Sequence, residues 1–207
     1  MQYLAHRLVW ILALVTWAFP LPASAGATPV TCLNEGENYC VSNASGCFHR
    51  GLKRVFIRCE TEGLRKAFDG ITCNQIPKAQ PDADLLNARC VLKHECDHAE
   101  VFQQKMGLNL CAAEFSAYHQ GARCLRETQK AYCPDGIPAS DCSSLSEEEK
   151  ADRLVMEFLR CKQRGGSKTI CETQCRLSGA KLFGKVRAQG FCASIFEGLG
   201  NCENEKF

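Results

Sequence analysis

Hydrophobic residues recur at intervals of three and four along most of the chain, whereas the apolar–polar alternation that marks strands is sparse. This periodicity predicts helices over residues 51–68 (with a break at Gly63), 82–106, 112–132, 143–162, 170–190 and 191–200. Short polar side chains accept hydrogen bonds from the free N–H groups at helix starts. We therefore expect Asp82 or Asp84 to cap the helix over 82–106, and Ser144 or Ser146 to cap the helix over 143–162.

These elements predict an all-α or mainly α protein, a disulfide-rich array of about five to six helices. The best candidate for a domain boundary is the segment 132–150, which carries two prolines, a Pro-Asp-Gly turn signal and an acidic run. It divides the chain into a cysteine-rich helical unit over 26–142 and a smaller one over 143–207. A single domain with a surface loop at this point is the alternative.

The first 25 residues have the pattern of a secretory signal peptide. A short basic start precedes an apolar run of twelve residues, two prolines and the small-residue sequence Ala-Ser-Ala. No later segment approaches the ~20 apolar residues that a membrane helix needs. We therefore expect a secreted, extracellular protein without a membrane span.

All sixteen cysteines follow this segment, and they make up roughly one residue in eleven after it, which is typical of disulfide scaffolds. Their number is even, so eight disulfides can form with no thiol left over, and the secretory route favours this outcome. The spacing leaves the pairing open, although Cys171 and Cys175, one helical turn apart, can each be joined to a neighbouring element. The cysteines predicted to be bridged are Cys32, Cys40, Cys47, Cys59, Cys73, Cys90, Cys96, Cys111, Cys124, Cys133, Cys142, Cys161, Cys171, Cys175, Cys192 and Cys202.

A second feature of the secretory route is the sequon Asn43-Ala44-Ser45, which predicts N-glycosylation at Asn43.

The sequence His94-Glu95-Cys96-Asp97-His98 fits the HExxH pattern, in which two histidines one helical turn apart bind zinc and the glutamate serves as general base. Three observations argue against this reading. The apolar stripe of the helix, from Leu85 to Met106, turns the two histidines toward solvent.

The second observation is that a third ligand has no motif: Val101 and Gln104 occupy the positions of the extended pattern, and Glu114 and His119 are the other possibilities. The third is that Cys96 lies inside the motif on the core face, where a disulfide is expected. A site built from Cys90, His94 and His98 would need a free thiol, which an oxidising compartment disfavours. No glycine-rich phosphate loop, GxSxG elbow or CxxC pair is present. We therefore expect no enzyme activity, no bound metal and no cofactor.

The net charge is only +2, but basic residues gather in two places. Arg50, Arg54 and Arg58 step by four and would line one helix face. Residues 160–187 contain eight basic side chains and one acidic one, with Lys181, Lys185 and Arg187 at the end of the run. Outside the cell such clusters suit sulfated polysaccharides, acidic proteins or anionic lipid surfaces, and we expect no nucleic acid as a partner.

The sequence therefore predicts a secreted, cysteine-rich, non-enzymatic glycoprotein that acts through its surface as an extracellular ligand, a matrix component or a venom-type effector. Its predicted partner is an extracellular protein or a glycosaminoglycan. The alternative is a zinc-dependent hydrolase or metallopeptidase that uses His94, Glu95 and His98.

Overall fold

The computed structural model describes residues 27–34, 36–40, 44–104, 106–134, 136, 138–205 and 207. The predicted signal peptide and the predicted glycosylation site at Asn43 lie outside the described residues.

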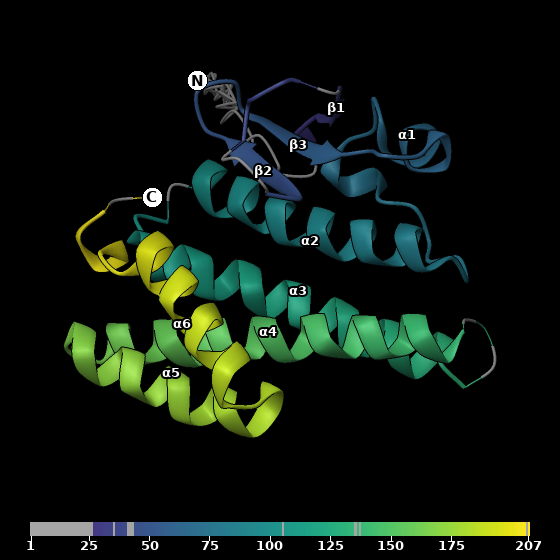
Figure 1. The fold of residues 1–207 in the computed structure, drawn as a ribbon. Coiled ribbons are helices and arrows are strands. Elements are labelled where there is room, and N and C mark those ends of the chain that lie inside the picture. Colours follow the sequence, from purple (N-terminus) through teal and green to yellow (C-terminus); the bar gives the residue numbers. More distant parts are fainter. Residues whose placement is uncertain are drawn as a thin grey trace, which may run out of the picture.

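Within this part of the chain, six α-helices follow a small sheet (Figure 1). The elements are β1 (Val30–Leu33), β2 (Gly46–His49), β3 (Arg54–Arg58), α1 (Glu62–Phe68), the 3₁₀ turn η2 (Cys73–Gln75), α2 (Ala83–Gln103), α3 (Leu110–Tyr132), α4 (Ala139–Gln163), α5 (Lys168–Phe183), α6 (Lys185–Leu199) and the 3₁₀ turn η3 (Cys202–Asn204). The prediction of a mainly α, disulfide-rich array is confirmed. None of the described helices combines the length and apolar character needed to cross a bilayer.

The predicted helix over 51–68 is wrong in its first half. Residues 54–58 form β3, the central strand of a sheet with the order β1-β3-β2, parallel to β1 and antiparallel to β2. Its three inner residues, Val55, Phe56 and Ile57, are all buried, because both faces of the strand are covered. A short apolar run of this kind has no alternation and resembles a helix by periodicity alone. The helix begins only at Glu62, where the Thr61 side chain accepts a hydrogen bond from the Leu64 N–H.

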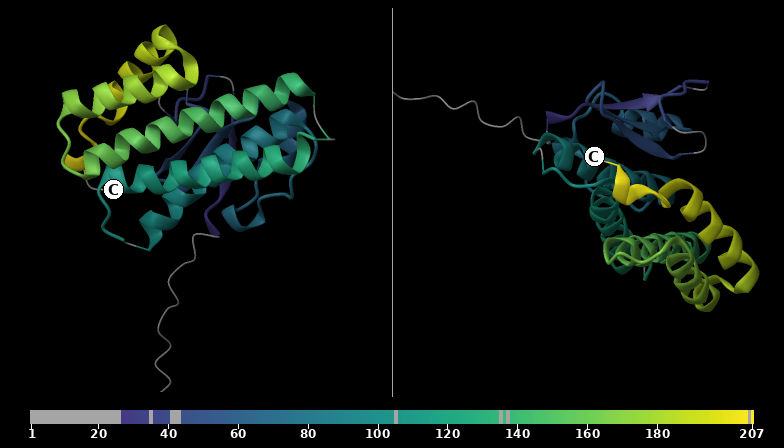
Figure 2. Two further views of the ribbon diagram at one scale, coloured as in Figure 1. Left: turned by 90° about the horizontal axis from the view of Figure 1, so that it is seen from below. Right: turned by 90° about the vertical axis from the view of Figure 1, so that its left-hand side faces the viewer.

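α2 is the central helix of the molecule. The sheet and α1 lie on one side of it, and α3 and α4 lie on the other (Figures 1 and 2). Its apolar stripe faces the sheet, where Leu92, Cys96 and Ala99 join one core cluster, as the sequence predicts. The stripe ends earlier than predicted, because α2 stops at Gln103 and Met106 is 51% exposed. Asp82, one of the two predicted caps, accepts a hydrogen bond from the Leu85 N–H.

The C-terminal half is an array of four helices, α3 to α6, around a second core cluster that includes Leu154, Phe158 and Leu159 of α4. α4 begins at Ala139, so the suggested boundary between residues 142 and 143 falls inside this helix. Neither Ser144 nor Ser146 is its cap, because the helix starts directly after Pro138, a residue that readily precedes or opens a helix. The helix predicted over 170–190 is divided at Gly184, whose φ of 81° suits glycine and ends α5.

Eight disulfides join all sixteen cysteines, every one of which lies within the described residues. A disulfide joins each of the helices α2 to α5 to the next helix along the chain, and the bridge from α3 starts at its C-cap residue Cys133. The bridges are Cys32–Cys59, Cys40–Cys47, Cys73–Cys96, Cys90–Cys124, Cys111–Cys202, Cys133–Cys142, Cys161–Cys171 and Cys175–Cys192. Cys171 and Cys175 join α5 to α4 and α6 respectively, so one turn of α5 is tied to both neighbouring helices.

Candidate functional site

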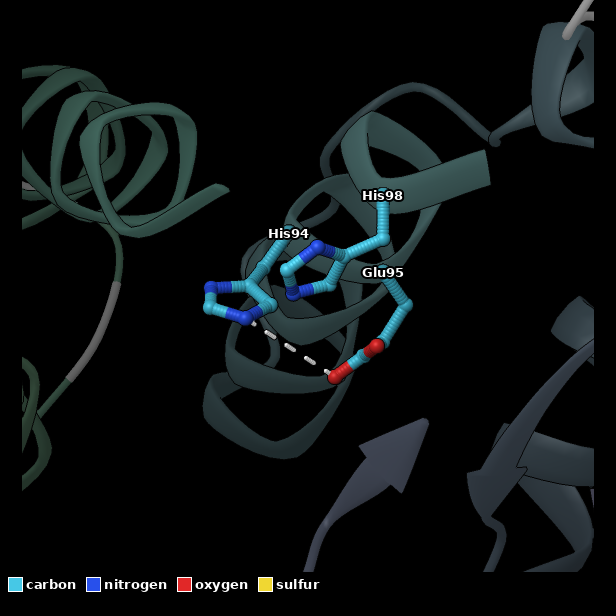
Figure 3. A group of neighbouring side chains, drawn as sticks. All are labelled: His94, Glu95 and His98. Carbon is cyan, nitrogen blue, oxygen red and sulfur yellow. Dashed lines mark ion pairs between the residues drawn. The ribbon is translucent and has the colours of Figure 1, made fainter. Parts of the chain in front are cut away.

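The histidines of the HECDH sequence point into the molecule and toward each other (Figure 3). The expectation that they face solvent is wrong, because α3 covers the face of α2 opposite the sheet. His98 is only 5% exposed, and the His94 side chain retains 15% of its exposure. A helix between two layers buries both faces, which a single apolar stripe does not reveal.

His98 pairs with Glu114 of α3, with Nε2 3.5 Å from the carboxylate oxygen Oε2. Burial alone would lower the pKa of His98, but the hydrogen bond and charge of Glu114, together with the charges of Glu95 and Asp97, raise it. For Glu114, burial alone would raise the pKa, and the partner His98 outweighs this and lowers it. The two groups therefore favour each other's charged forms. Nδ1 of His98 is buried and has no hydrogen-bond partner among the described residues.

Glu95, the residue after His94, is 8% exposed and lies beside β2. Burial raises its pKa to about 7, while the backbone of Phe48 on β2 and the charge of His98 act in the opposite direction. Gly46 of β2 makes this approach possible, because a Cβ there would lie 3.2 Å from Cγ of Glu95 and 3.0 Å from the Phe56 carbonyl oxygen.

His94 lies among aromatic rings. Its ring centroid is 4.6 Å from that of Tyr118 and 4.9 Å from that of His98, both edge to face. Burial, with the charge of His98, lowers the pKa of His94 to about 3, so this imidazole is neutral at physiological pH. Burial also raises the pKa of the Tyr118 hydroxyl.

These groups line a cavity of about 590 Å³. Its walls come from β2, α2, α3, α4 and α6, with the C-terminal Phe207 as a further wall. The Phe207 ring lies 5.1 Å from the His98 ring, and the guanidinium of Arg50 lies 4.1 Å above the Phe207 ring. The apolar part of the cavity lining includes Leu110, Val155, Phe191, Ile195 and Leu199.

Asp152 of α4 is a site residue that the sequence reading missed. It lines the cavity, and burial, with the nearby charges of Glu148 and Glu149, raises its pKa to about 7. Gly121 of α3 lies directly opposite, because a Cβ there would be 2.9 Å from Oδ2 of Asp152. The sequence did contain a pattern that could have indicated Asp152. Glu148 and Asp152 are acids one turn apart on a helix that also carries Leu145 and Val155.

Of the ligand candidates that the sequence suggested, the structure brings some together and separates others. His94, Glu95 and His98 each offer a donor atom within 4.8 Å of the others, and Glu114 is next to His98. His119 is exposed and does not line the cavity. Cys90 is bridged to Cys124, so its sulfur is no thiolate ligand. Cys111, Cys202 and Glu203 also cluster, but the two cysteines form a disulfide.

The first of the two predicted basic surfaces is not the helical row of arginines that the sequence predicted. Arg54 and Arg58 lie on β3 and not on a helix; they donate hydrogen bonds to Thr31 Oγ1 and to the Ala44 carbonyl, both at 2.8 Å. Arg50 lies in the β2–β3 turn above Phe207. The three arginines therefore do not form the helical row that their spacing suggested.

The second basic segment surrounds the α5–α6 turn. Lys181 and Lys185 are exposed there, whereas Arg187 pairs with Glu147 at 2.7 Å. Lys162, earlier in the same segment, is buried against Glu203 at 2.8 Å. Only part of this positive charge is therefore presented on the surface.

The fold and the cavity define a class: a disulfide-rich, mainly α-helical protein with a small three-stranded sheet and a group of buried titratable side chains at a partly open cavity. The chain matches no protein-family model, and no curated protein and no solved structure is significantly similar to it.

Proposed function

We propose that the protein is a secreted, disulfide-cross-linked binding protein whose ligand occupies the cavity between β2, α2, α3, α4 and α6. The observation that carries this proposal is the cavity itself, about 590 Å³ in volume and lined by buried polar groups. Binding sites for small molecules have volumes of about 300–1,000 Å³, apolar walls and a few convergent polar groups.

The disulfides support the extracellular part of this proposal. Eight bridges that use every cysteine indicate an extracellular or otherwise oxidising environment. They also hold the cavity walls in place, because Cys90–Cys124 joins two wall helices, α2 and α3, and Cys175–Cys192 ties the wall helix α6 to α5, which lies outside the cavity. A cavity with fixed walls requires less ordering when a ligand binds, which favours affinity.

The cavity also contains the chemistry that orients a ligand. The apolar side chains of α6 lie on one wall, and the carboxyl groups of Glu95 and Asp152 lie on the others. Buried carboxyl groups with raised pKa values are typical of binding and catalytic sites. A small organic molecule with an apolar body and a hydrogen-bonding end fits this arrangement.

The second candidate is the zinc-dependent hydrolase that the HECDH sequence suggests. The observation in its favour is that His94, Glu95 and His98 line the cavity and do not face solvent. Hydrolysis by this motif requires a metal ion in addition to the cavity, whereas binding does not. We therefore place the non-enzymatic function first.

Fluorescence of Nile red, a neutral apolar dye, tests the proposed function on the mature protein. Gly198 lines the cavity, and a side chain at this position would meet no atom within 4 Å of its Cβ, so Gly198→Leu narrows the cavity without a clash at Cβ. Gly190, on the same helix but away from the cavity, has equally open surroundings, and Gly190→Leu is the matched control. We expect saturable dye binding that Gly198→Leu weakens several-fold and that Gly190→Leu leaves unchanged. No saturable binding, or equal binding by both variants, would overturn the proposal.

A further inference from the structure

Two imidazoles and two carboxylates converge at the inner wall of the cavity. Nε2 of His94 lies 4.0 Å from Oε1 of Glu95, and Nε2 of His98 lies 3.5 Å from Oε2 of Glu114. Figure 3 shows the side chains of His94, Glu95 and His98 pointing toward one another from adjacent turns of α2. We propose that these four side chains bind one divalent transition-metal ion, with Zn²⁺ as the best match. This inference rests on the proposed function, because it identifies one ligand of the same cavity.

The spacing of the donors suits such an ion. Zinc binds imidazole nitrogens and carboxylate oxygens at about 2.0–2.2 Å, so two ligands of a tetrahedral site lie roughly 3.3–3.5 Å apart. The separations of 3.5 and 4.0 Å are close to this value, and the donors of His94, Glu95 and His98 all lie within 4.8 Å of one another. Glu114 contacts His98 but is not part of the group of donors within 4.8 Å of one another, so its side chain has to rotate toward the other three to complete the coordination.

The donor types select the metal. Imidazole with carboxylate suits zinc and its neighbours in the first transition row, whereas calcium and magnesium prefer a shell made of oxygens alone. Two glutamates also match the double charge of the cation, which matters in a site screened from water. His98 is 5% exposed, and its other ring nitrogen, Nδ1, has no hydrogen-bond partner among the described residues.

The number of protein ligands separates a binding site from a hydrolytic one. A catalytic zinc site keeps one coordination position for water, while a site with four protein ligands is closed. With Glu114 on α3 as the fourth donor, Glu95 becomes a ligand and no longer a free general base. The proposed site therefore belongs to a protein that holds its metal and does not hydrolyse a substrate with it.

Elemental mass spectrometry and Co²⁺ absorption spectroscopy test this inference on the mature protein, first stripped with a chelator and then reloaded with either metal alone. We expect about one zinc per chain, a tetrahedral Co²⁺ spectrum, and a loss of affinity of at least roughly 10–100-fold in His94→Ala/His98→Ala. Glu114→Gln and Glu95→Gln should each weaken binding, because each removes a charged donor. His119→Ala changes an exposed histidine of α3 and should retain full occupancy.

Near-ultraviolet circular dichroism and the intact mass, which reports eight disulfides, show that each variant is folded. Less than one zinc per chain in the unmutated protein, or equal zinc in the histidine double variant, would overturn the inference. An unchanged affinity in Glu114→Gln would overturn the closed four-ligand site. Nile red binding in the same samples separates the two proposals: dye binding without zinc contradicts only the metal site, and zinc without dye binding contradicts only the proposed function.

Discussion

His98 of α2 and Glu114 of α3 form a buried pair, with 3.5 Å between Nε2 and Oε2. On α3, Glu114 lies close to Cys111, which is bridged to Cys202 of η3, and about three helical turns before Cys124, which is bridged to Cys90 of α2. The pair is one of several polar groups inserted between α2 and α3, because His94 packs edge to face on Tyr118 and the Asp97 carboxyl is hydrogen-bonded to Ser116. Such insertions are costly unless both groups have partners, which makes them good candidates for function.

Removal of the Glu114 charge should lower the pKa of His98. In the metal-free protein, the hydrogen bond and charge of Glu114 are the main effects that oppose the burial of His98. In Glu114→Gln, burial dominates, and we expect the pKa of His98 to fall below the ordinary value for histidine. A proton NMR titration of the imidazole signals measures this change. A His98 pKa that stays above the ordinary value would show that Glu114 does not control it.

The prediction of this site from the sequence failed at one particular step. The apolar stripe through Leu92, Cys96 and Ala99 correctly identified the face of α2 that packs on the sheet. It did not reveal that α3 covers the opposite face, because that information depends on which helices meet in space. The same limit applies to β3, where three consecutive buried residues carry no alternation. The positions of helices α2 to α4 were predictable because their periodicity extends over several turns, whereas the break between α5 and α6 was predicted near residue 190 and lies at Gly184.

The pairing of the cysteines was not predictable for a related reason. Each bridge depends on the distance between elements, and sixteen cysteines allow on the order of two million pairings. Cys171 and Cys175 were an exception in part, since their spacing places them on one side of a helix where each can reach a neighbour.

Asp152 should make the protein less stable as the pH rises from about 4 to about 7. Its pKa is raised from 3.8 to about 7 in the folded chain, so over this interval the unfolded chain has released the proton while the folded chain retains it. The free energy of unfolding therefore falls as the pH rises through this interval, and it stops falling above pH 7, where both states have released the proton. Four other groups lie near Asp152. Glu148 and Glu149 face it from its own helix, and Tyr118 faces it from α3. His94 lines the same cavity.

The neutral variant Asp152→Asn isolates this effect. We expect it to remove roughly 1–3 kcal/mol of the pH-dependent decrease in the free energy of unfolding between pH 4 and pH 7.5, allowing for relaxation around the charged group. Guanidinium unfolding curves at the two pH values, with disulfides intact, measure the difference. Glu157→Gln changes an exposed acid of the same helix and serves as the control. An identical pH dependence in Asp152→Asn and the unmutated chain would contradict the prediction.

Gly179 should not tolerate a side chain. It lies where α5 meets both α4 and α6, and a Cβ there would be 2.9 Å from Cβ of Ala188 and 3.0 Å from Cδ2 of Leu154. Gly179→Ala should therefore lower the free energy of unfolding by about 1–3 kcal/mol, the usual cost of overpacking. Gly190→Ala, in open surroundings on α6, should instead raise it by about 0.4–1 kcal/mol. Thermal unfolding of both variants measures the contrast, and a stabilising Gly179→Ala would show that α5 packs differently.

The α5–α6 turn should contribute more to polyanion binding than the arginines of β3. Lys181 and Lys185 are exposed on this turn, beside Val186, which is 89% exposed, whereas Arg54 and Arg58 already donate hydrogen bonds to neighbouring oxygens. An arginine with a protein partner has to give up that contact before it binds a sulfate group, but an extended lysine does not.

Heparin chromatography with a salt gradient compares the two surfaces. We expect Lys181→Glu/Lys185→Glu to elute at clearly lower salt than the unmutated chain, and Arg54→Glu/Arg58→Glu to shift less. Arg187→Ala should have a small effect, since Arg187 is paired with Glu147. Strong retention that survives the lysine reversal would exclude the α5–α6 turn as the contact, because opposite charges at the same positions repel sulfates. If the arginine reversal alone abolished retention, the polyanion site would lie on the sheet, on the side of the molecule away from α5.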